Sequence, residues 1–111
     1  MLACALIPLV LCAASALTED QKIEKLIQTV AEMKDAVFIR NGAEHTPAQA
    51  AQHMRNKWEH AKDQVKTAEE FIDKLASKSS ASGKPYLIRF KDGREVESGT
   101  FLREQLKKLN A

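Results

Sequence analysis

Cysteine is almost absent from this sequence, and its two cysteines lie close to the start. Among 111 residues, the only thiols belong to Cys4 and Cys12. A chain that begins at Leu17 therefore has no thiol at all. This excludes a disulfide framework and a thiolate metal site from the remaining domain, which packing alone has to stabilise.

Charged side chains are also absent from the first sixteen residues. An apolar run from Leu2 to Ala13 leads into Ala14-Ser15-Ala16, the small-x-small pattern that signal peptidase accepts. A permanent spanning helix needs about 20 apolar residues, which this run does not supply. We therefore predict a signal peptide over residues 1–16, cleavage after Ala16 and no stable membrane anchor after cleavage.

The expected destination is the periplasm of a Gram-negative bacterium, with secretion as the alternative. A lipid anchor is a further alternative, because Leu9-Val10-Leu11-Cys12 resembles a lipobox. The lipobox has a small residue where this chain has the bulky Leu11. We therefore favour cleavage after Ala16 over lipidation of Cys12.

A strong excess of one charge is lacking as well. The 17 Lys and Arg and the 15 Asp and Glu all follow Ala16, and the two signs alternate along the chain. This pattern has neither the basic stripe of a nucleic-acid-binding protein nor a polybasic membrane patch, so we expect no nucleic-acid partner. With no linker and no repeat, residues 17–111 are predicted to form one domain.

The glycines that phosphate and nucleophile motifs require are missing too. Gly83-Lys84 has no upstream glycine and is followed by proline, so it is not a phosphate-binding loop. The stretch Ser80–Gly83 lacks the first glycine of a nucleophile elbow. No cofactor is therefore expected.

Helix signals divide the chain clearly. Thr18, Thr46 and Thr67 each open a capping-box pattern, and apolar residues at helical spacing follow them. We predict a first helix over about 19–33 or 34, a second from Pro47, a third from about Ala68 to Ser77 and a last one capped by Ser98 or Thr100. Trp58 of the second helix should be buried against the first and last helices, near Phe71 and Phe101.

Strand signals lie between these helices. Val37–Arg40 is β-branched and aromatic, and Asn41-Gly42 after it is typical of a type I′ hairpin turn with a short return arm. Tyr86–Phe90 alternates like a half-buried strand, and Glu95–Glu97 is its predicted partner. The order α-β-α-α-β-β-α predicts an α+β domain of about four helices packed on a short antiparallel sheet.

The three histidines are the first candidates for metal ligands. His53 and His60 are two turns apart on one predicted helix, hence about 10 Å along its axis, too far to share a zinc ion. We therefore expect no metal site. His53 either lies at the edge of the apolar stripe, with one side of its ring packed inward and a nitrogen in water, or belongs to a polar pocket with Arg40 and His45.

The polar stretch around the Asn41-Gly42 turn is the best candidate for a site. Arg40 suits an anionic ligand beside the imidazoles, and its structural alternative is an ion pair with Glu44. In the serine-rich loop, Ser77 and Ser79 are expected to satisfy helix-end carbonyls, unless the loop faces a ligand. The candidate binding residues occupy the predicted turn, the second helix and this loop: Arg40, Asn41, His45, His53, Lys57, Ser80, Ser82 and Tyr86.

Four motifs together resemble one family of small exported bacterial proteins, domain of unknown function 5329. They begin at Phe38, Ala50, Ala68 and Ser79 and read Phe-Ile-Arg-Asn-Gly-x-Glu-His, Ala-Ala-x-His-Met-Arg-x-Lys-Trp, Ala-Glu-x-Phe-Ile and Ser-Ser-x-Ser-Gly-Lys-Pro-Tyr. The resemblance implies a single periplasmic domain without an assigned activity. Similar proteins carry cysteines where this chain has Ala36 and Phe90, which implies that segments 37–40 and 86–90 lie side by side.

Two functions from different classes follow. The first is a non-catalytic binding module whose polar rim holds an unknown polar or anionic ligand or an envelope protein. The second is a small envelope hydrolase in which His45 or His53 acts as general base and Ser80 or Ser82 as nucleophile. The hydrolase requires a histidine within hydrogen-bond reach of a serine, with a third group orienting it.

Overall fold

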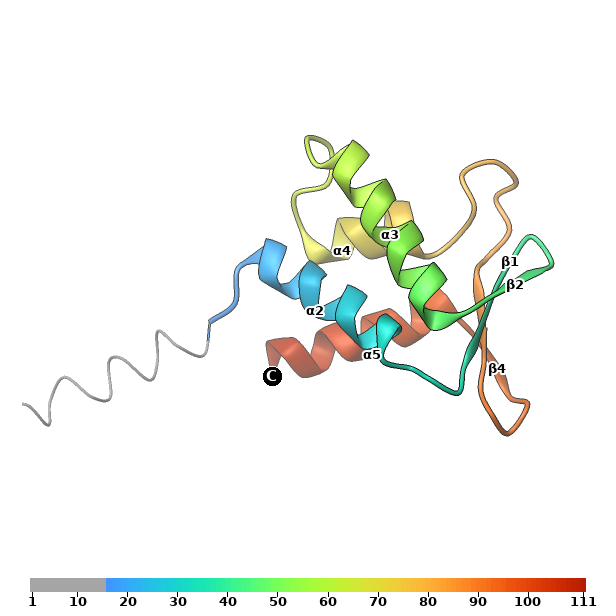
Figure 1. Cartoon of the computed structure of the whole chain (residues 1–111). Coiled ribbons are helices and arrows are strands. Elements are labelled where there is room, and N and C mark those ends of the chain that lie inside the picture. The colour runs from blue at the N-terminus through green and yellow to red at the C-terminus, as the bar shows by residue number, and fades with distance from the viewer. Residues whose placement is uncertain (1–15) are drawn as a thin grey trace, which may run out of the picture.

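The structure of the protein is a computed structural model that describes residues 16–111 (Figure 1). The predicted signal peptide, apart from Ala16, and both cysteines lie outside the described residues. The described part is an α+β domain, as predicted. Its elements are helix α2 (Glu19–Ala31), strands β1 (Val37–Arg40) and β2 (Ala43–His45), helices α3 (Pro47–Ala61) and α4 (Ala68–Phe71), the π-helix η2 (Ile72–Ala76), strands β3 (Leu87–Arg89) and β4 (Glu95–Glu97), and helix α5 (Ser98–Asn110).

The capping residues that the sequence indicates do start three of the helices. The hydroxyls of Thr18, Thr46 and Thr67 each accept a hydrogen bond from the backbone N–H three residues later. The glutamine or glutamate at that later position accepts one from the backbone N–H of the threonine in return. Each box satisfies backbone groups that a helix start would otherwise leave unpaired.

A four-stranded antiparallel sheet stands at one end of the helices, in the order β2-β1-β3-β4. Asn41 and Gly42 have φ values of 52° and 80°, the left-handed conformation that the predicted type I′ turn requires. The return arm Ala43–His45 is a strand of its own, paired along its length with β1. Phe38 lies opposite Ile88, which confirms that segments 37–40 and 86–90 are neighbours.

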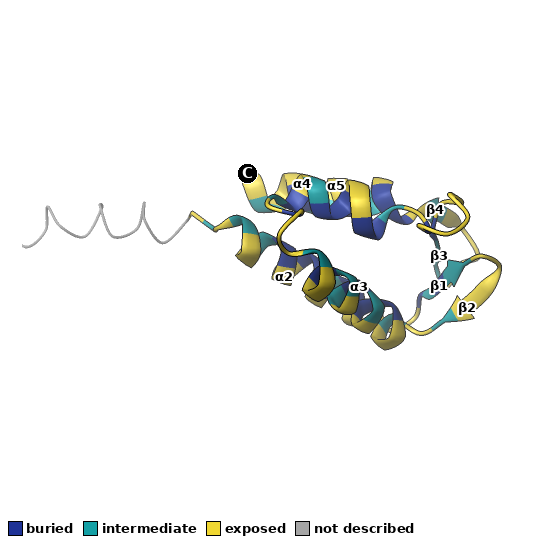
Figure 2. Ribbon diagram, turned by 90° about the horizontal axis from the view of Figure 1, so that it is seen from above, coloured by how far each residue is buried: buried dark blue, intermediate teal, exposed yellow. Residues whose placement is uncertain are grey.

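The helices form two layers, and the sheet closes one end of the space between them (Figure 2). Helices α2 and α3 make one layer, and α4 with α5 makes the other. Between them, Trp58 is 2% exposed and meets Phe71 edge-on, with 6.4 Å between ring centroids. Phe101, which we expected beside Trp58, instead lies half-buried against Phe90 at a centroid distance of 6.2 Å.

Two helix ends differ from expectation. The third predicted helix is α-helical only to Phe71 and continues as the π-helix η2, where the Ser77 hydroxyl donates to the Ile72 carbonyl. Neither Ser98 nor Thr100 caps α5, because Glu97 occupies the N-cap position and makes no side-chain capping bond. Ser98 is instead fully buried in the first turn.

The outer face of the sheet carries charged side chains in register. Glu44 and Glu95 flank Arg89, whose guanidinium lies 2.6 Å and 3.7 Å from their carboxylates. Within residues 16–111, none of the helices combines the length and apolar character needed to cross a membrane.

Candidate functional site

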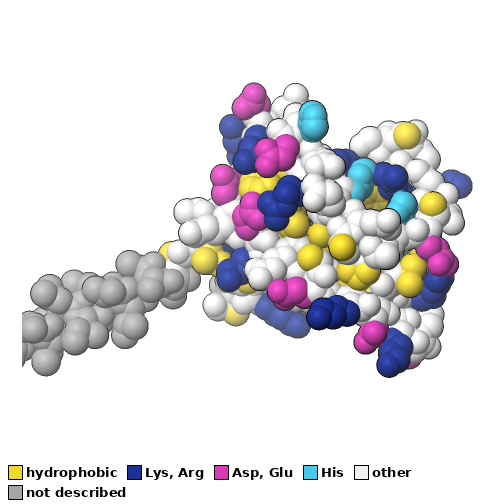
Figure 3. All heavy atoms as spheres, viewed as in Figure 1, with side chains coloured by type: hydrophobic (Ala, Val, Ile, Leu, Met, Phe, Trp, Pro, Cys, Tyr) yellow, Lys and Arg dark blue, Asp and Glu magenta, His cyan; other side chains and the backbone are white. Residues whose placement is uncertain are grey.

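A pocket of about 230 Å³ lies between the inner face of the sheet and the first half of α3. Its apolar floor and polar rim come from β1, β2, α3 and the start of α5. Figure 3 shows histidine and basic side chains around an opening with apolar atoms inside it. The lining residues are Phe38, Ile39, Arg40, His45, Gln49, Ala50, His53, Met54, Tyr86 and Ser98.

Strand register explains why distant residues meet in this pocket. Phe38 pairs with Ile88 on one side and with His45 on the other. Alternate residues of a strand share a face, so Arg40 lies on the same inner face as Phe38. Continuing the register places Arg40 opposite Tyr86, and the Ser98 N–H donates to the Tyr86 carbonyl at 2.9 Å. One row across the sheet therefore presents Arg40, Tyr86 and Ser98 to the pocket.

Arg40 contacts His53 rather than the acid expected for it. Its Nη1 lies 2.9 Å from Nε2 and 3.2 Å from Nδ1 of the imidazole. A guanidinium only donates, so a ring nitrogen of His53 has to accept and the imidazole is neutral in this contact. The predicted alternative, an ion pair between Arg40 and Glu44, is wrong: Glu44 lies on the opposite face and pairs with Arg89.

The surroundings of His53 also favour its neutral form. Burial lowers the pKa of His53 below its ordinary value, and electrostatic interaction with Arg40, Lys57 and His45 lowers it further. Desolvation and like charge both penalise the imidazolium. The rim is thus a site of positive potential that holds an uncharged imidazole.

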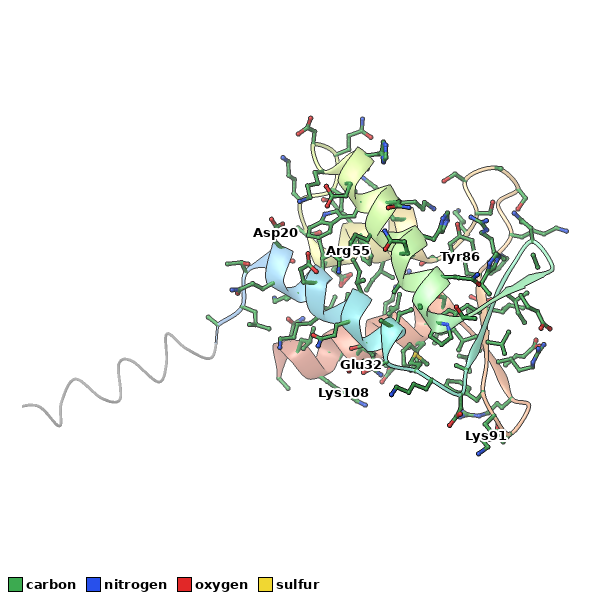
Figure 4. The ribbon with its side chains drawn as sticks, in the orientation of Figure 1. Asp20, Glu32, Arg55, Tyr86, Lys91 and Lys108 are labelled. Atoms are coloured by element: carbon green, nitrogen blue, oxygen red, sulfur yellow. The ribbon has the colours of Figure 1, made fainter. Side chains whose placement is uncertain are left out.

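Tyr86 forms one wall of the pocket and is fixed from two sides. The Lys57 ammonium donates to the Tyr86 hydroxyl at 3.1 Å and lies 5.3 Å from the ring centroid. The His53 ring meets it edge-on at a centroid distance of 6.3 Å. Figure 4 shows Tyr86 between the sheet and α3. Lys57 does not line the pocket, so it contributes to the predicted site by positioning Tyr86.

Two buried polar atoms in the described part of the chain have no protein partner, and both belong to residues that line this pocket. They are Nε2 of His45 and Oγ of Ser98. Buried polar atoms are nearly always hydrogen-bonded in folded proteins. Water or a ligand in the pocket would complete their hydrogen bonding.

The predicted serine loop lies outside the pocket and is tied to the hairpin turn. Ser82 Oγ donates to the Asn41 side-chain oxygen at 2.5 Å, and the Asn41 amide donates to Ser79 Oγ at 3.3 Å. Ser79 Oγ also accepts from the N–H groups of Ala81 and Ser82. The expectation that Ser79 caps helix-end carbonyls is therefore wrong, whereas Ser77 does bond one. Ser80 is exposed.

The three histidines make different contacts. His53 faces Arg40, His60 bonds the Asn56 carbonyl within its own helix at 2.8 Å, and His45 lies at the pocket. Between residues 16 and 111, no three histidine, cysteine, aspartate or glutamate side chains gather closely enough to hold a metal ion.

The structure thus brings together part of the predicted site. Arg40, His45, His53 and Tyr86 line one pocket, whereas Asn41 and Ser82 clamp a loop beside it. Sequence reasoning did not place Phe38, Gln49, Ala50, Met54 or Ser98 at the site. Ser98 had been assigned to a cap, and its position at a strand-to-helix junction was the one local signal that it could have another role.

Comparison with known proteins gives a family but no activity. The model of a family of unknown function, DUF5329, matches residues 17–110. The chain is 43% identical over 68 residues to YfeK of Salmonella typhimurium, itself described as an uncharacterized protein. That match covers 61% of this chain and 57% of the relative, so the chain spans little more than half of YfeK. No solved structure matches.

Proposed function

The chain belongs to the family of unknown function DUF5329, and we propose that it is an exported, non-catalytic module that binds a small polar or anionic ligand in the pocket between the sheet and α3. The observation that carries this proposal is the coincidence of a cavity with two unpartnered buried polar atoms, Nε2 of His45 and Oγ of Ser98. Concave, largely apolar pockets with a few convergent polar groups are the usual form of small-molecule sites.

The contacts of His53 favour binding over hydrolysis. A histidine that acts as general base has to become an imidazolium, and a neighbouring acid normally stabilises that charge. Here the neighbours of His53 are the cations Arg40 and Lys57, which lower its pKa. In the proposed hydrolase, Ser82 would be activated by a histidine, but its hydroxyl donates to Asn41.

Export is supported by the position of the first described helix. Helix α2 starts at Glu19 and its cap is Thr18, so cleavage after Ala16 would leave every described helix and strand intact. The periplasm of a Gram-negative bacterium is the location that we propose, with secretion as the alternative. Mass spectrometry of a periplasmic extract is expected to find a chain that begins at Leu17. Retention of residues 1–16, or a diacylglycerol on Cys12, would contradict this.

Binding can be tested on the mature protein, residues 17–111, purified from periplasm without denaturation. Native mass spectrometry is expected to show a bound small molecule, and heat denaturation is expected to release it. Ala50→Leu adds volume to the pocket lining and should abolish the bound species. Ala48→Leu is the matched control, because Ala48 is exposed on the same helix and does not line this pocket.

A partner protein would give a different result. A pull-down from periplasm with the mature chain as bait would then capture an envelope protein in both the wild type and Ala50→Leu. If, in addition, no small molecule accompanied the wild type, the pocket would not be the binding site and the proposal would be wrong.

A further inference from the structure

The arginines of this protein differ in one respect that points to the charge of the ligand. Arg55, Arg89, Arg94 and Arg103 each lie within salt-bridge distance of a carboxylate. Arg40 is the remaining arginine of the sequence, and it forms no ion pair with a carboxylate of the described residues. It is also half-buried at the mouth of the pocket. A half-buried guanidinium without a carboxylate beside it still has N–H donors that can bind an anion.

The charge around Arg40 has a single sign. No aspartate or glutamate lines the pocket, whereas the Arg40 guanidinium does, and the Lys57 ammonium lies close enough to His53 to lower its pKa. A cationic ligand would meet repulsion from every charged neighbour. An anion would meet a planar donor group that can bind both oxygens of a carboxylate.

The apolar floor and the volume of the pocket limit which ligands can fit. Phe38, Ala50 and Met54 supply an apolar surface inside the charged rim. A cavity of about 150 Å³ can hold benzene, and drug-sized ligands need roughly 300–1,000 Å³. At about 230 Å³ this pocket fits a body somewhat larger than a benzene ring.

The inner end of the pocket offers an uncharged hydrogen-bonding group. Ser98 is 0% exposed, and its hydroxyl has no protein partner. It lies in the same row as Arg40 but two strands away, a separation of roughly 10 Å between the two backbones at about 4.8 Å per strand. A ligand with its anionic end on Arg40 would therefore reach Ser98 with the far end of a short chain.

We propose that the ligand is a small organic carboxylate that binds Arg40 through its acid group, places an apolar body of roughly five to eight carbons on the pocket floor, and carries an uncharged oxygen that reaches Ser98. This inference rests on the proposed binding function and assigns its chemical class. Arg40 at the rim would favour a negatively charged ligand, and the pocket floor would limit the size of its apolar part. Ser98 would favour an uncharged oxygen at the other end of the ligand.

The test uses four probes of equal chain length: 6-hydroxyhexanoate, hexanoate, 1-hexanol and hexylamine. Each is titrated into the isotopically labelled mature protein, and backbone and imidazole chemical shifts report occupancy. The two acids are expected to bind, the hydroxy acid more tightly. The bound carboxylate should also raise the pKa of His53 relative to the free protein, because the anion favours the imidazolium.

Variants separate the parts of the inference. Arg40→Gln is expected to weaken both acids by at least about tenfold, the size of one charge-assisted hydrogen bond. Arg89→Gln is the matched control on the outer face of the sheet and should leave affinity unchanged. Ser98→Ala should remove the preference for the hydroxy acid over hexanoate and leave hexanoate affinity unchanged.

The outcomes also separate this inference from the binding function. If 1-hexanol or hexylamine bound as well as the acids, or if Arg40→Gln bound the acids normally, the carboxylate assignment would be wrong while the pocket remained a binding site. If none of the four probes bound, the carboxylate assignment would likewise be overturned, and the co-purified species lost in Ala50→Leu would still report on the binding function.

Discussion

Helix α3 passes through two environments, and the contrast between its ends locates the site. At its C-terminal end, Trp58 is buried against Phe71 inside an apolar core that includes Ile23, Leu26 and Leu102. At its N-terminal half, Ala50, His53 and Met54 face a cavity with unpartnered polar atoms. Packing alone accounts for the first environment. The second contains groups that cost stability without a partner, and it is the part of the domain in which we propose the binding site.

The largest effect is expected at the packed end. Trp58→Ala removes a side chain that is 2% exposed and leaves a cavity, which should cost about 3–5 kcal/mol of the free energy of unfolding. Urea denaturation followed by circular dichroism measures this. A midpoint like that of the wild type would show that the helical layers do not depend on Trp58, and the contrast between the two ends of α3 would fail.

Two buried serines should respond in opposite ways. Ser79→Ala removes an acceptor used by Asn41, Ala81 and Ser82, and it should cost about 1–3 kcal/mol of unfolding free energy. Ser98→Ala removes a buried hydroxyl without a protein partner and should leave stability unchanged or slightly higher. Both variants are compared by urea denaturation. An equal loss in the two would mean that Ser98 is satisfied within the fold.

The polar rim should contribute little to stability. Arg40→Ala and His53→Ala both break the contact between these two half-buried side chains, and His53→Ala also removes the edge-on contact with Tyr86. Each is expected to change the free energy of unfolding by less than about 0.5 kcal/mol. Each should melt within a few degrees of the wild type and lose the bound molecule. A steep fall in the melting temperature of either variant would assign that residue to the fold and remove it from the site.

The smallest expected effect is a dependence of the free energy of unfolding on pH, caused by the titration of His53. Its pKa in the folded protein is lowered by burial and by Arg40, so the unfolded chain binds a proton first as the pH falls. The contribution of neutral His53 to the free energy of unfolding is fully present above about pH 6.5, the ordinary pKa of histidine. It is lost as the pH falls from there through the lower pKa of the folded protein. Imidazole NMR measures that pKa, which Arg40→Gln should raise. A folded pKa above 6.5 in the wild type would contradict the positive potential of the rim.

Much of the fold was predictable because its signals are local. The three threonine caps and the Asn41-Gly42 turn each depend on residues within a few positions of one another, and all four are present. The boundaries that differed depend on distant contacts. Ser98 does not cap α5 but is buried at the pocket, and the third helix becomes a π-helix where it packs against α5.

The candidate site was only partly predictable for the same reason. Arg40, His45 and His53 were recognisable because polar residues cluster around a turn and continue along one helix face. Their partners were not, because strand register decides which face each strand residue occupies. Register directed Glu44 to the outer face with Arg89, and Arg40 to the inner face with His53.

By itself, the sequence determined the type and order of the helices and strands, since capping, turn chemistry and apolar spacing act over a few residues. It also determined the net balance of charge and the near absence of thiols. Tertiary structure alone decided that β1, α3 and the start of α5 enclose a cavity, and that Arg40 has no acid beside it. Those properties arise where segments distant in the chain meet, and such meetings depend on register and packing across the whole domain.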